Sequence, residues 1–322
     1  MAIGNPPPAA PAAAPAGTQL QRLLRMVEAR PPLRTAVVHP VDVLSLTGAV
    51  EAARRSLIEP VLIGPVARVR AAASAAGLDL AGLEVMDVEH SHQAAARACE
   101  LASRGEAAAI MKGALHTDEL LEAVVAGRSG LRTDRRMSHV FVLDVPSYPR
   151  PLLVSDAALN IAPDLAAKRD IVQNAIDCAH AMDIPEPRVA ILAAVETVNP
   201  KMASTLDAAA LCKMADRGQI VGGRLDGPLA FDNAISVEAA AAKGIRSEVA
   251  GRADILIVPD IESGNILAKQ LFYLAGAQSA GIVMGARVPI MLTSRSDPEA
   301  SRLASCALAI LVSQHKPAKY LR

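Results

Sequence analysis

The stretch VAILAA, residues 189–194, decides the fold class of this chain. Its side chains are all apolar, whereas a strand with one face in water alternates apolar and polar residues. A uniformly apolar strand is buried on both faces, as in parallel sheets that helices cover on each side. Short runs rich in Val and Ile recur along the chain, with longer helix-like stretches between them. This alternation is typical of βαβ units, so we expect an α/β fold with helices flanking mostly parallel sheets.

The same pattern predicts where the elements lie. Strands are expected at residues 35–39, 60–63, 84–88, 107–111, 139–145, 152–154, 189–194, 255–258, 281–284 and 290–293. Helices are expected at residues 93–104, 118–125, 163–182, 205–215, 266–274 and 299–312. In such folds the loops at the carboxyl ends of strands carry the ligands, so polar stretches that follow strands are candidate sites.

Length and composition narrow the class of protein. A chain of 322 residues exceeds a typical single domain, which favours two lobes or one large one. Aromatic residues make up only 2% of the chain, which argues against nucleic-acid binding by base stacking. Lys and Arg total 33, as do Asp and Glu, so no long-range field attracts DNA or an anionic membrane. Any site that binds an anion must therefore depend on positive groups in its immediate surroundings and not on the net charge of the protein.

Metal, redox and membrane signals are missing from the sequence. The four cysteines are scattered, and no pair of histidines has metal-ligand spacing, so we expect no metal and no cofactor. No apolar run approaches the roughly 20 residues that a membrane span needs, and no signal peptide is recognisable. We therefore expect a cytoplasmic protein that binds neither nucleic acid nor membrane.

Residues 1–17, MAIGNPPPAAPAAAPAG, differ from the rest of the chain. They are rich in Pro and Ala, carry no charged side chain and show no periodicity. Such a segment cannot bury enough apolar surface to order itself, so we expect a disordered tail or a linker.

The stretch LTSRSDPE, residues 292–299, is the first candidate site. Asp297 and Pro298 are typical of the N-cap and first position of a helix, whose positive end favours an anion near Ser294 and Arg295. Arg295 is able to bind a phosphate or a developing oxyanion, and Ser294 a thiol or a phosphate oxygen. A structural alternative keeps Asp297 as a cap and Arg295 as a surface ion pair.

A second candidate is GLRTDRRMSHV, residues 130–140, which places three arginines in one polar turn. Arg132 and its neighbours suit a phosphate-rich ligand, although such clusters are often solvated loops. Ser138 is a candidate donor to phosphate. His139 titrates near neutral pH in its ordinary state, but a lone histidine beside a strand is often structural.

Weaker candidates follow other strands. They are Lys112 and Thr117 in MKGALHT, Asp226 in a predicted Asp-Gly-Pro turn, and Asp260, Ser263, Gly264 and Asn265 in a predicted loop. Helix capping explains Thr117 and Asp260 equally well. The chain has no GxGxxG, GxxxxGK[ST] or GxSxG motif, so the common dinucleotide, nucleoside-triphosphate and serine-hydrolase interpretations lack their defining residues.

Taken together, these stretches resemble the phosphate acetyltransferase and phosphate butyryltransferase family. The resemblance runs from about residue 30 to about residue 313, and its most specific pieces include GLRTDRRMSHV, VSDAALNIAPDL (154–165), ADILIVPDIESGN (253–265) and PIMLTSRSD (289–297). It implies a two-lobed fold similar to isocitrate and isopropylmalate dehydrogenases, with the active site in the cleft between the lobes. It also implies a homodimer. We expect residues 18–148 with 291–322 in the first lobe and 149–290 in the second.

The resemblance also implies a reaction, acyl-CoA plus phosphate giving acyl phosphate plus coenzyme A, without a covalent enzyme intermediate. In the reverse direction a base removes the thiol proton and the thiolate attacks the acyl phosphate carbonyl. Ser294 matches the serine that holds the thiol, Arg295 the arginine that stabilises the carbonyl and phosphate oxygens, and Ser138 a serine that contacts phosphate.

One departure leaves the general base open. Members of the acetyl branch carry an aspartate where this chain has Ser301. Asp297 is then the nearest acid, as in the butyryl branch, and His139 is the next candidate. The stretches GLRTD and LTSRSD also lean towards the butyryl branch. Two other hypotheses stay open, a dehydrogenase on the same fold and a non-catalytic or tethered module that binds coenzyme A.

Overall fold

A computed structural model describes residues 18–292 and 297–315. The predicted tail, residues 1–17, lies outside the described residues. The strands are β1 (Leu33–Val38), β2 (Ile58–Ile63), β3 (Glu84–Met86), β4 (Ala109–Lys112), β5 (Ser138–Asp144), β6 (Leu152–Ser155), β7 (Arg188–Leu192), β8 (Arg224–Leu229), β9 (Ile255–Ile257), β10 (Gln278–Met284) and β11 (Ile290–Met291).

These strands form one continuous sheet in the order β3-β2-β1-β4-β11-β10-β5-β6-β9-β7-β8. Both ends of the sheet are parallel, and the antiparallel pairs are the central ones, β11 with β10, β10 with β5, and β5 with β6. The predicted α/β class, with helices flanking mostly parallel strands, is confirmed, and the strands form a single sheet. The strand VAILAA corresponds to β7, which pairs with β8 and β9 on its two sides.

Helices cover both faces of the sheet. They are α1 (Thr18–Val27), α2 (Val43–Arg54), α3 (Val66–Ala76), α4 (Ser91–Ser103), α5 (Thr117–Val125), α6 (Leu165–Ala181), α7 (Ala203–Asp216), α8 (Phe231–Ile235), α9 (Val237–Ala242), α10 (Ile261–Tyr273) and α11 (Glu299–Gln314), with a 3₁₀ turn at Gly127–Ser129. One face carries a single long core with α1, α2, α3, α6, α7 and α11. The other face has two cores, one under α4 and α5 and one under α8, α9 and α10.

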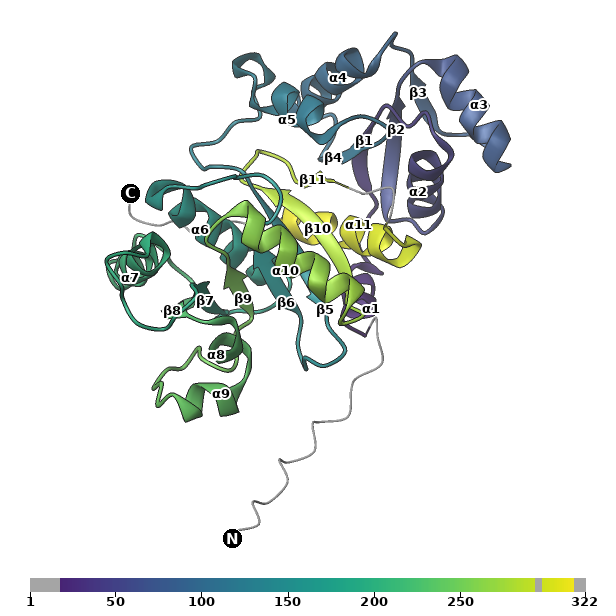
Figure 1. Cartoon of the computed structure of the whole chain (residues 1–322). Coiled ribbons are helices and arrows are strands. Elements are labelled where there is room, and N and C mark those ends of the chain that lie inside the picture. The colour runs from purple at the N-terminus through teal and green to yellow at the C-terminus, as the bar shows by residue number, and fades with distance from the viewer. Residues whose placement is uncertain (1–17, 293–296, 316–322) are drawn as a thin grey trace.

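Figure 1 shows two lobes on either side of the central strands, with β1 to β4 in one and β6 to β9 in the other. Helix α11 lies against this centre and packs on β10, α1, α6 and α2, so this helix contacts both lobes. The lobe boundaries given above stay a prediction. None of the helices in the described part of the chain has the length and apolar character that crossing a membrane requires.

Three expectations about individual elements were wrong. Asp226 lies within β8 and not in a turn, because the backbone of residues 224–229 pairs with β7 around a register shift. Helix α10 begins at Ile261, five residues before the predicted start, so Ser263, Gly264 and Asn265 are helical. Helix α11 has Pro298, not Asp297, as its N-cap residue.

Candidate active site

A cavity of about 820 Å³ lies between α5 of the first lobe and α6 of the second. Its walls are one side of α5, residues 132–137, the turn at Leu159 and Asn160, and the first turns of α6. We call it the interlobe pocket. Its volume lies within the range that small-molecule sites usually have. The pocket fits the cleft that the resemblance implies.

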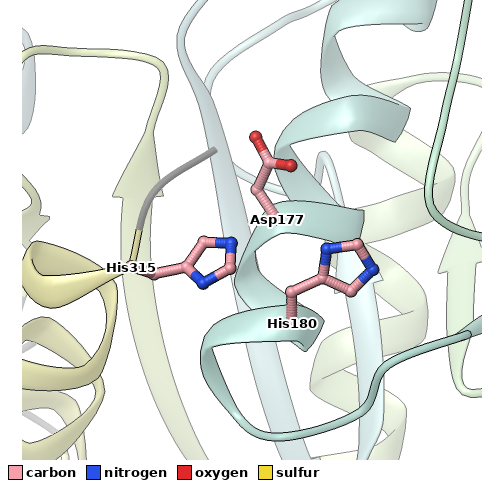
Figure 2. A group of neighbouring side chains, drawn as sticks. All are labelled: Asp177, His180 and His315. Carbon is pink, nitrogen blue, oxygen red and sulfur yellow. The ribbon is translucent and has the colours of Figure 1, made fainter. Parts of the chain in front are cut away.

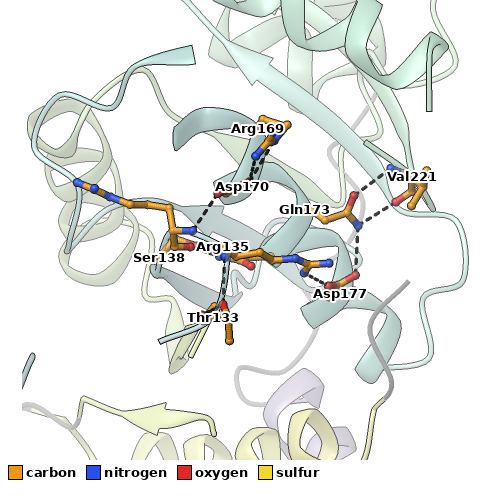
Figure 3. A network of polar contacts seen from close by, with 11 residues as sticks. Thr133, Arg135, Ser138, Arg169, Asp170, Gln173, Asp177 and Val221 are labelled. Carbon is orange, nitrogen blue, oxygen red and sulfur yellow. Dashed lines mark hydrogen bonds and ion pairs between the residues drawn. The ribbon is translucent and has the colours of Figure 1, made fainter. Parts of the chain in front are cut away.

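Two of the arginines predicted in segment 130–137 are tied to α6. Arg135 forms an ion pair with Asp177, whose side chain is buried at 1% exposure. Gln173 donates to the other carboxylate oxygen of Asp177 at 3.2 Å and to the carbonyl of Val221 at 3.1 Å. Figure 3 shows this network running along α6. Arg135 therefore attaches the loop to the second lobe.

Arg136 is held by hydrogen bonds, without an ion pair to its guanidinium. Its Nε donates to Oδ1 of Asn160 at 2.8 Å, and its backbone N–H donates to Asp170 at 2.9 Å. Among residues 18–292 and 297–315, no carboxylate forms an ion pair with the Arg136 guanidinium. The side chain is thus positioned on the pocket wall while its charge stays available to an anion.

Arg132 lines the same pocket from the exposed part of the loop. Its backbone bridges to Ala286, which fixes the chain there. Within the described part of the chain its guanidinium has no hydrogen-bond or ion-pair partner. The structure therefore places this predicted phosphate ligand beside Arg136.

Two carboxylates on the pocket walls, Asp164 and Asp170, are engaged with the protein itself. Asp164 caps α6 by accepting from the backbone N–H of Ala167 at 2.8 Å. Asp170 pairs with Arg169 at 2.8 Å. Asp118 and Glu122 lie on the exposed side of α5. These contacts leave Arg132 and Arg136 as cations without a carboxylate partner of their own.

Asp156 organises the turn that holds Asn160. It is 2% exposed and accepts from the backbone N–H groups of Ala158, Leu159 and Asn160 at 3.0 to 3.1 Å. Burial raises the pKa of the Asp156 carboxyl, and these hydrogen bonds oppose the rise. In the sequence this residue stands out only as part of the motif VSDAALNIAPDL. A lone Asp-to-Asn spacing of four residues carries no signal of the turn that it builds.

Ser138 and His139 point to opposite faces of β5, because successive side chains of a strand alternate. Ser138 is fully buried and lies 2.9 Å from Nδ2 of Asn174, from which it accepts a hydrogen bond. His139 is 2% exposed, stacks edge-on against Phe141, and has its pKa lowered to about 4 by burial. Neither belongs to the described walls of the interlobe pocket. Their roles as phosphate ligands stay predictions, and their burial favours a structural role.

The catalytic pair predicted at Ser294 and Arg295 lies outside the described residues. The chain enters that segment from β11, which pairs with β4 of the first lobe. It returns at Asp297, which is half-buried and whose backbone carbonyl accepts from Nη1 of Arg302 at 2.6 Å. Since Pro298 takes the N-cap position of α11, Asp297 is not the helix cap that its sequence context suggested.

The weaker candidates in the first lobe end β4 and begin α5. Nζ of Lys112 donates to the backbone carbonyls of Gly113 and Leu115 at 3.3 and 3.2 Å. Thr117 is the first residue of α5, and the N-cap residue is His116, so the predicted capping role of Thr117 was wrong. Neither Lys112 nor Thr117 belongs to the described walls of the pocket.

The candidates in segment 258–265 satisfy one another. The Asp260 side chain accepts from the backbone N–H of Ser263 at 2.8 Å, which lowers the pKa of the Asp260 carboxyl. Asn265 donates to the carbonyl of Ala157 at 3.3 Å. A Cβ on Gly264 would come within 2.6 Å of Cγ2 of Val258, so only glycine lets α10 pack this closely. None of these residues lines the described pocket.

Comparison with known proteins gives the family. The model described as phosphate acetyl/butaryl transferase matches residues 91–310. A phosphate acetyltransferase of Rhizobium meliloti is 57% identical over 94% of this chain and 95% of its own length. A phosphate butyryltransferase of Clostridium acetobutylicum is 41% identical over 91% of this chain and 98% of its own. Relatives with both names match, so the lean towards the butyryl branch stays a prediction.

Solved structures agree with these relatives. A branched-chain phosphotransacylase from Enterococcus faecalis has a TM-score of 0.77 at 28% identity, covering 88% of this chain and all of its own. A 4-hydroxythreonine-4-phosphate dehydrogenase from Klebsiella pneumoniae, at 16% identity and a TM-score of 0.54 over 88% of this chain and all of its own, shares the fold alone. The family model matches residues 91–310, and the relatives match over more than nine tenths of the chain. This chain therefore belongs to the phosphate acetyl/butaryl transferase family.

Proposed function

We propose that this chain transfers a short acyl group between coenzyme A and phosphate, with the reacting groups bound in the interlobe pocket. The observation that carries the proposal is the pair Arg132 and Arg136, which line the pocket without a carboxylate partner among the described residues. Membership of the phosphate acetyl/butaryl transferase family supplies the reaction class. No cofactor enters the reaction, because coenzyme A is a substrate.

The chemistry needs positive charge on two groups of oxygens. A phosphate oxygen attacks the thioester carbonyl carbon, the carbonyl oxygen takes on negative charge, and the carbon–sulfur bond breaks to release the thiolate. Guanidinium groups bind phosphate with two parallel hydrogen bonds and stabilise a developing oxyanion. Arg132 and Arg136 would hold phosphate, while Ser294 and Arg295 would hold the thiol and the carbonyl oxygen. A free thiol has a pKa of roughly 8.5, so nearby positive charge makes thiolate a good leaving group.

For the reverse direction we favour Asp297 over His139 as the general base. Asp297 is half-buried and adjoins the segment that carries Ser294 and Arg295. His139 is 2% exposed and sits beneath the strand surface against Phe141. A base must reach within hydrogen-bond distance of the proton that it removes, which an enclosed imidazole does not.

Initial rates with acetyl-CoA, propionyl-CoA, butyryl-CoA and isobutyryl-CoA, with and without phosphate, test the proposal. Phosphate-dependent release of free thiol is expected with at least one of them, and the ratio of kcat/KM values gives the preferred acyl chain. One methylene changes that ratio by about 10- to 200-fold at most. Coenzyme A binding without phosphate-dependent turnover would favour the non-catalytic module instead.

We also propose a homodimer, formed through the exposed face of α10. Tyr273 and Leu274 at its end are 78% and 83% exposed, and Ile266 on the same helix is 59% exposed. Ile161, 74% exposed, is next to the start of this helix, because its carbonyl accepts from the backbone N–H of Ile261. Large apolar side chains exposed along one helix in this way are typical of a protein–protein interface.

The mass in solution by light scattering tests the dimer. The native chain should run at twice 33.5 kDa, and the double change Tyr273→Glu with Leu274→Glu should give a monomer. A matched control is Val43→Glu, an exposed apolar residue at the start of α2, which should leave the mass unchanged. A native chain that runs as a monomer at tens of micromolar would exclude the proposal.

A further inference from the structure

Three potential metal ligands meet away from the interlobe pocket. Asp177 and His180 are three residues apart on α6, and His315 follows the last residue of α11. One ligand atom from each lies within 4.8 Å of the other two. The two imidazole rings are 5.9 Å apart, centre to centre. Figure 2 shows Asp177 and His180 on α6 and the neighbouring ring of His315 at the end of α11.

The hydrogen bonding of His180 leaves one nitrogen available to a metal. Its Nε2 lies 2.6 Å from the carbonyl oxygen of Gly222. A carbonyl only accepts, so Nε2 carries the hydrogen and Nδ1 keeps its lone pair. Imidazoles that bind metals usually donate their other N–H to a carbonyl or carboxylate in this way. Gly222, at φ +84°, allows this contact, because a Cβ there would collide with the His180 ring.

His315 supplies a second nitrogen with no use inside the protein. Its Nε2 is buried and has no hydrogen-bond partner among the described residues. A buried polar atom without a partner is rare and costs free energy, so such an atom calls for a function. Among the buried polar atoms without a partner in the described structure, only this one belongs to the cluster.

Asp177 supplies the carboxylate. Its two oxygens already accept from Gln173 and Arg135, and each oxygen has a second lone pair free for coordination. Gln173 and Arg135 also fix the orientation of the carboxylate. The positive charge of Arg135 opposes a cation beside the same group, so affinity should be lower than in a site without it.

An opening beside the cluster gives access from solvent. A cavity of about 490 Å³ is lined by His180, Asp183 and Pro185. It is separate from the interlobe pocket, which has none of these residues on its described walls. Water molecules in this opening are able to complete the coordination of an ion held by three protein ligands.

We propose that Asp177, His180 and His315 bind a divalent transition metal, with Zn²⁺ as the ion of choice. Two imidazoles and one carboxylate suit Zn²⁺, Co²⁺ and Ni²⁺ and disfavour Mg²⁺ and Ca²⁺, which prefer oxygen ligands. With Zn–N bonds of about 2.0 to 2.1 Å, ligand atoms in a tetrahedral site lie roughly 3.3 Å apart. Rotation of the side chains would close the present spacing to that value, since His315 follows the last residue of α11 and is only partly buried.

Metal binding here links the end of α11 to α6. These helices pack together on the same face of the sheet, and α11 also contacts both lobes. A metal bound only by the folded chain stabilises it by linkage. The site would thus stabilise the fold through its last helix and would take no part in acyl transfer.

Titration of the full-length, tag-free and chelator-treated chain with Co²⁺ tests the site. One equivalent should produce the visible absorption bands of tetrahedral Co²⁺, and Zn²⁺ should abolish them by displacement. His180→Gln and His315→Gln should each weaken Co²⁺ binding at least 10-fold. The control His92→Gln, which changes a histidine whose side chain is 74% exposed, should bind Co²⁺ like the native chain.

A thermal measurement keeps the test decisive if one variant is poorly folded. Zn²⁺ at about 100 times its native Kd should raise Tm by a few degrees in the native chain and in the His92 variant, and by about half as much or less in the His315 variant. His315 follows the last residue of α11 and is only partly buried, so its change should leave the fold intact. Equal Co²⁺ affinity in the native chain and the His315 variant, or no tetrahedral spectrum at all, would overturn the proposal.

Discussion

Residues 130–137 and residues 258–265 are both polar segments beside strand ends, yet their charged groups face different surroundings. In the first, which we call the open segment, Arg132 and Arg136 line the interlobe pocket with no carboxylate partner among the described residues. In the second, the closed segment, Asp260 caps α10 and accepts from Ser263. A polar segment beside a strand end is thus of one of two kinds. It is either the start of a helix whose polar groups hydrogen-bond to one another, or a ligand site with a charged side chain that no carboxylate of the protein neutralises.

The largest expected effect comes from removing the positive charge of Arg136. Arg136→Gln keeps a donor near Asn160 but removes the cation, so kcat/KM for phosphate should fall about 100- to 1000-fold, which is about 3 to 4 kcal/mol in transition-state stabilisation. Initial rates at varied phosphate concentration measure it. Arg70→Gln, an exposed arginine on α3, is the matched control and should leave kcat/KM unchanged. Equal rates for the two variants would show that the open segment binds no reacting group.

The strand that follows the open segment offers the next test, because His139 is sealed inside the protein. Burial lowers the pKa of His139 to about 4, whereas the unfolded chain has the ordinary value near 6.5. The unfolded state therefore binds more protons in this range. The free energy of unfolding should stay constant above pH 6.5 and fall by about 3 kcal/mol as the pH drops to 4.

Urea unfolding at pH 7 and pH 4.5 measures this change. His139→Gln should reduce the loss of stability between the two pH values, whatever it does to stability at pH 7. His92→Gln, which changes an exposed histidine, should retain the full loss. A variant at position 139 with the native pH dependence would mean that His139 is reached by water and remains a possible base.

Packing in the closed segment gives a smaller effect. Gly264→Ala places a methyl group 2.6 Å from Val258 and 3.1 Å from Cα of Ala157, so α10 must shift. The expected loss is about 1 to 3 kcal/mol in the free energy of unfolding, measured in urea. Gly127→Ala is the control, since no atom lies within 4 Å of its new methyl group. Equal stability of the two variants would contradict the close packing of α10.

The sequence predicted the parts of the fold that depend on periodicity. Apolar runs such as VAILAA located most strands, since burial on both faces leaves a direct trace in residue type. The joining of all strands into one sheet left no such trace, because the antiparallel pairing of β10 with β5 is a long-range contact. Asp226 was placed in a turn from its Gly and Pro neighbours, but pairing with β7 overrides that local preference.

The sequence identified candidate site residues by their type, but it did not show the surroundings of each side chain. Arg132 was selected, and it lines the pocket. Arg136 was noticed only as part of a cluster, and Asn160 and Asp156, which position it, were missed as site residues. Their function arises from a turn that joins residues 24 positions apart, which no local pattern encodes. Ser294 and Arg295 stay predictions that rest on the resemblance and on the position of β11.

The smallest expected effect separates a cap from a ligand at Asp260. If its carboxylate serves only α10, Asp260→Ala should lower the free energy of unfolding by about 1 kcal/mol, and Asp260→Asn by less, because asparagine also caps helices well. The backbone N–H of Ser263 lowers the pKa of Asp260, so the cap's contribution should be present at neutral pH and be lost as the pH falls below the ordinary value of about 3.9.

Urea unfolding at pH 7 and pH 3 measures the stability of both variants, and initial rates measure their KM for coenzyme A. Neither variant should change KM by more than about twofold, since a change of 1 kcal/mol in folding leaves almost every molecule folded. A tenfold higher KM in Asp260→Asn, with stability preserved, would instead place coenzyme A on the closed segment. Both segments would then bind a ligand through charged side chains, and they would differ only in which substrate each binds.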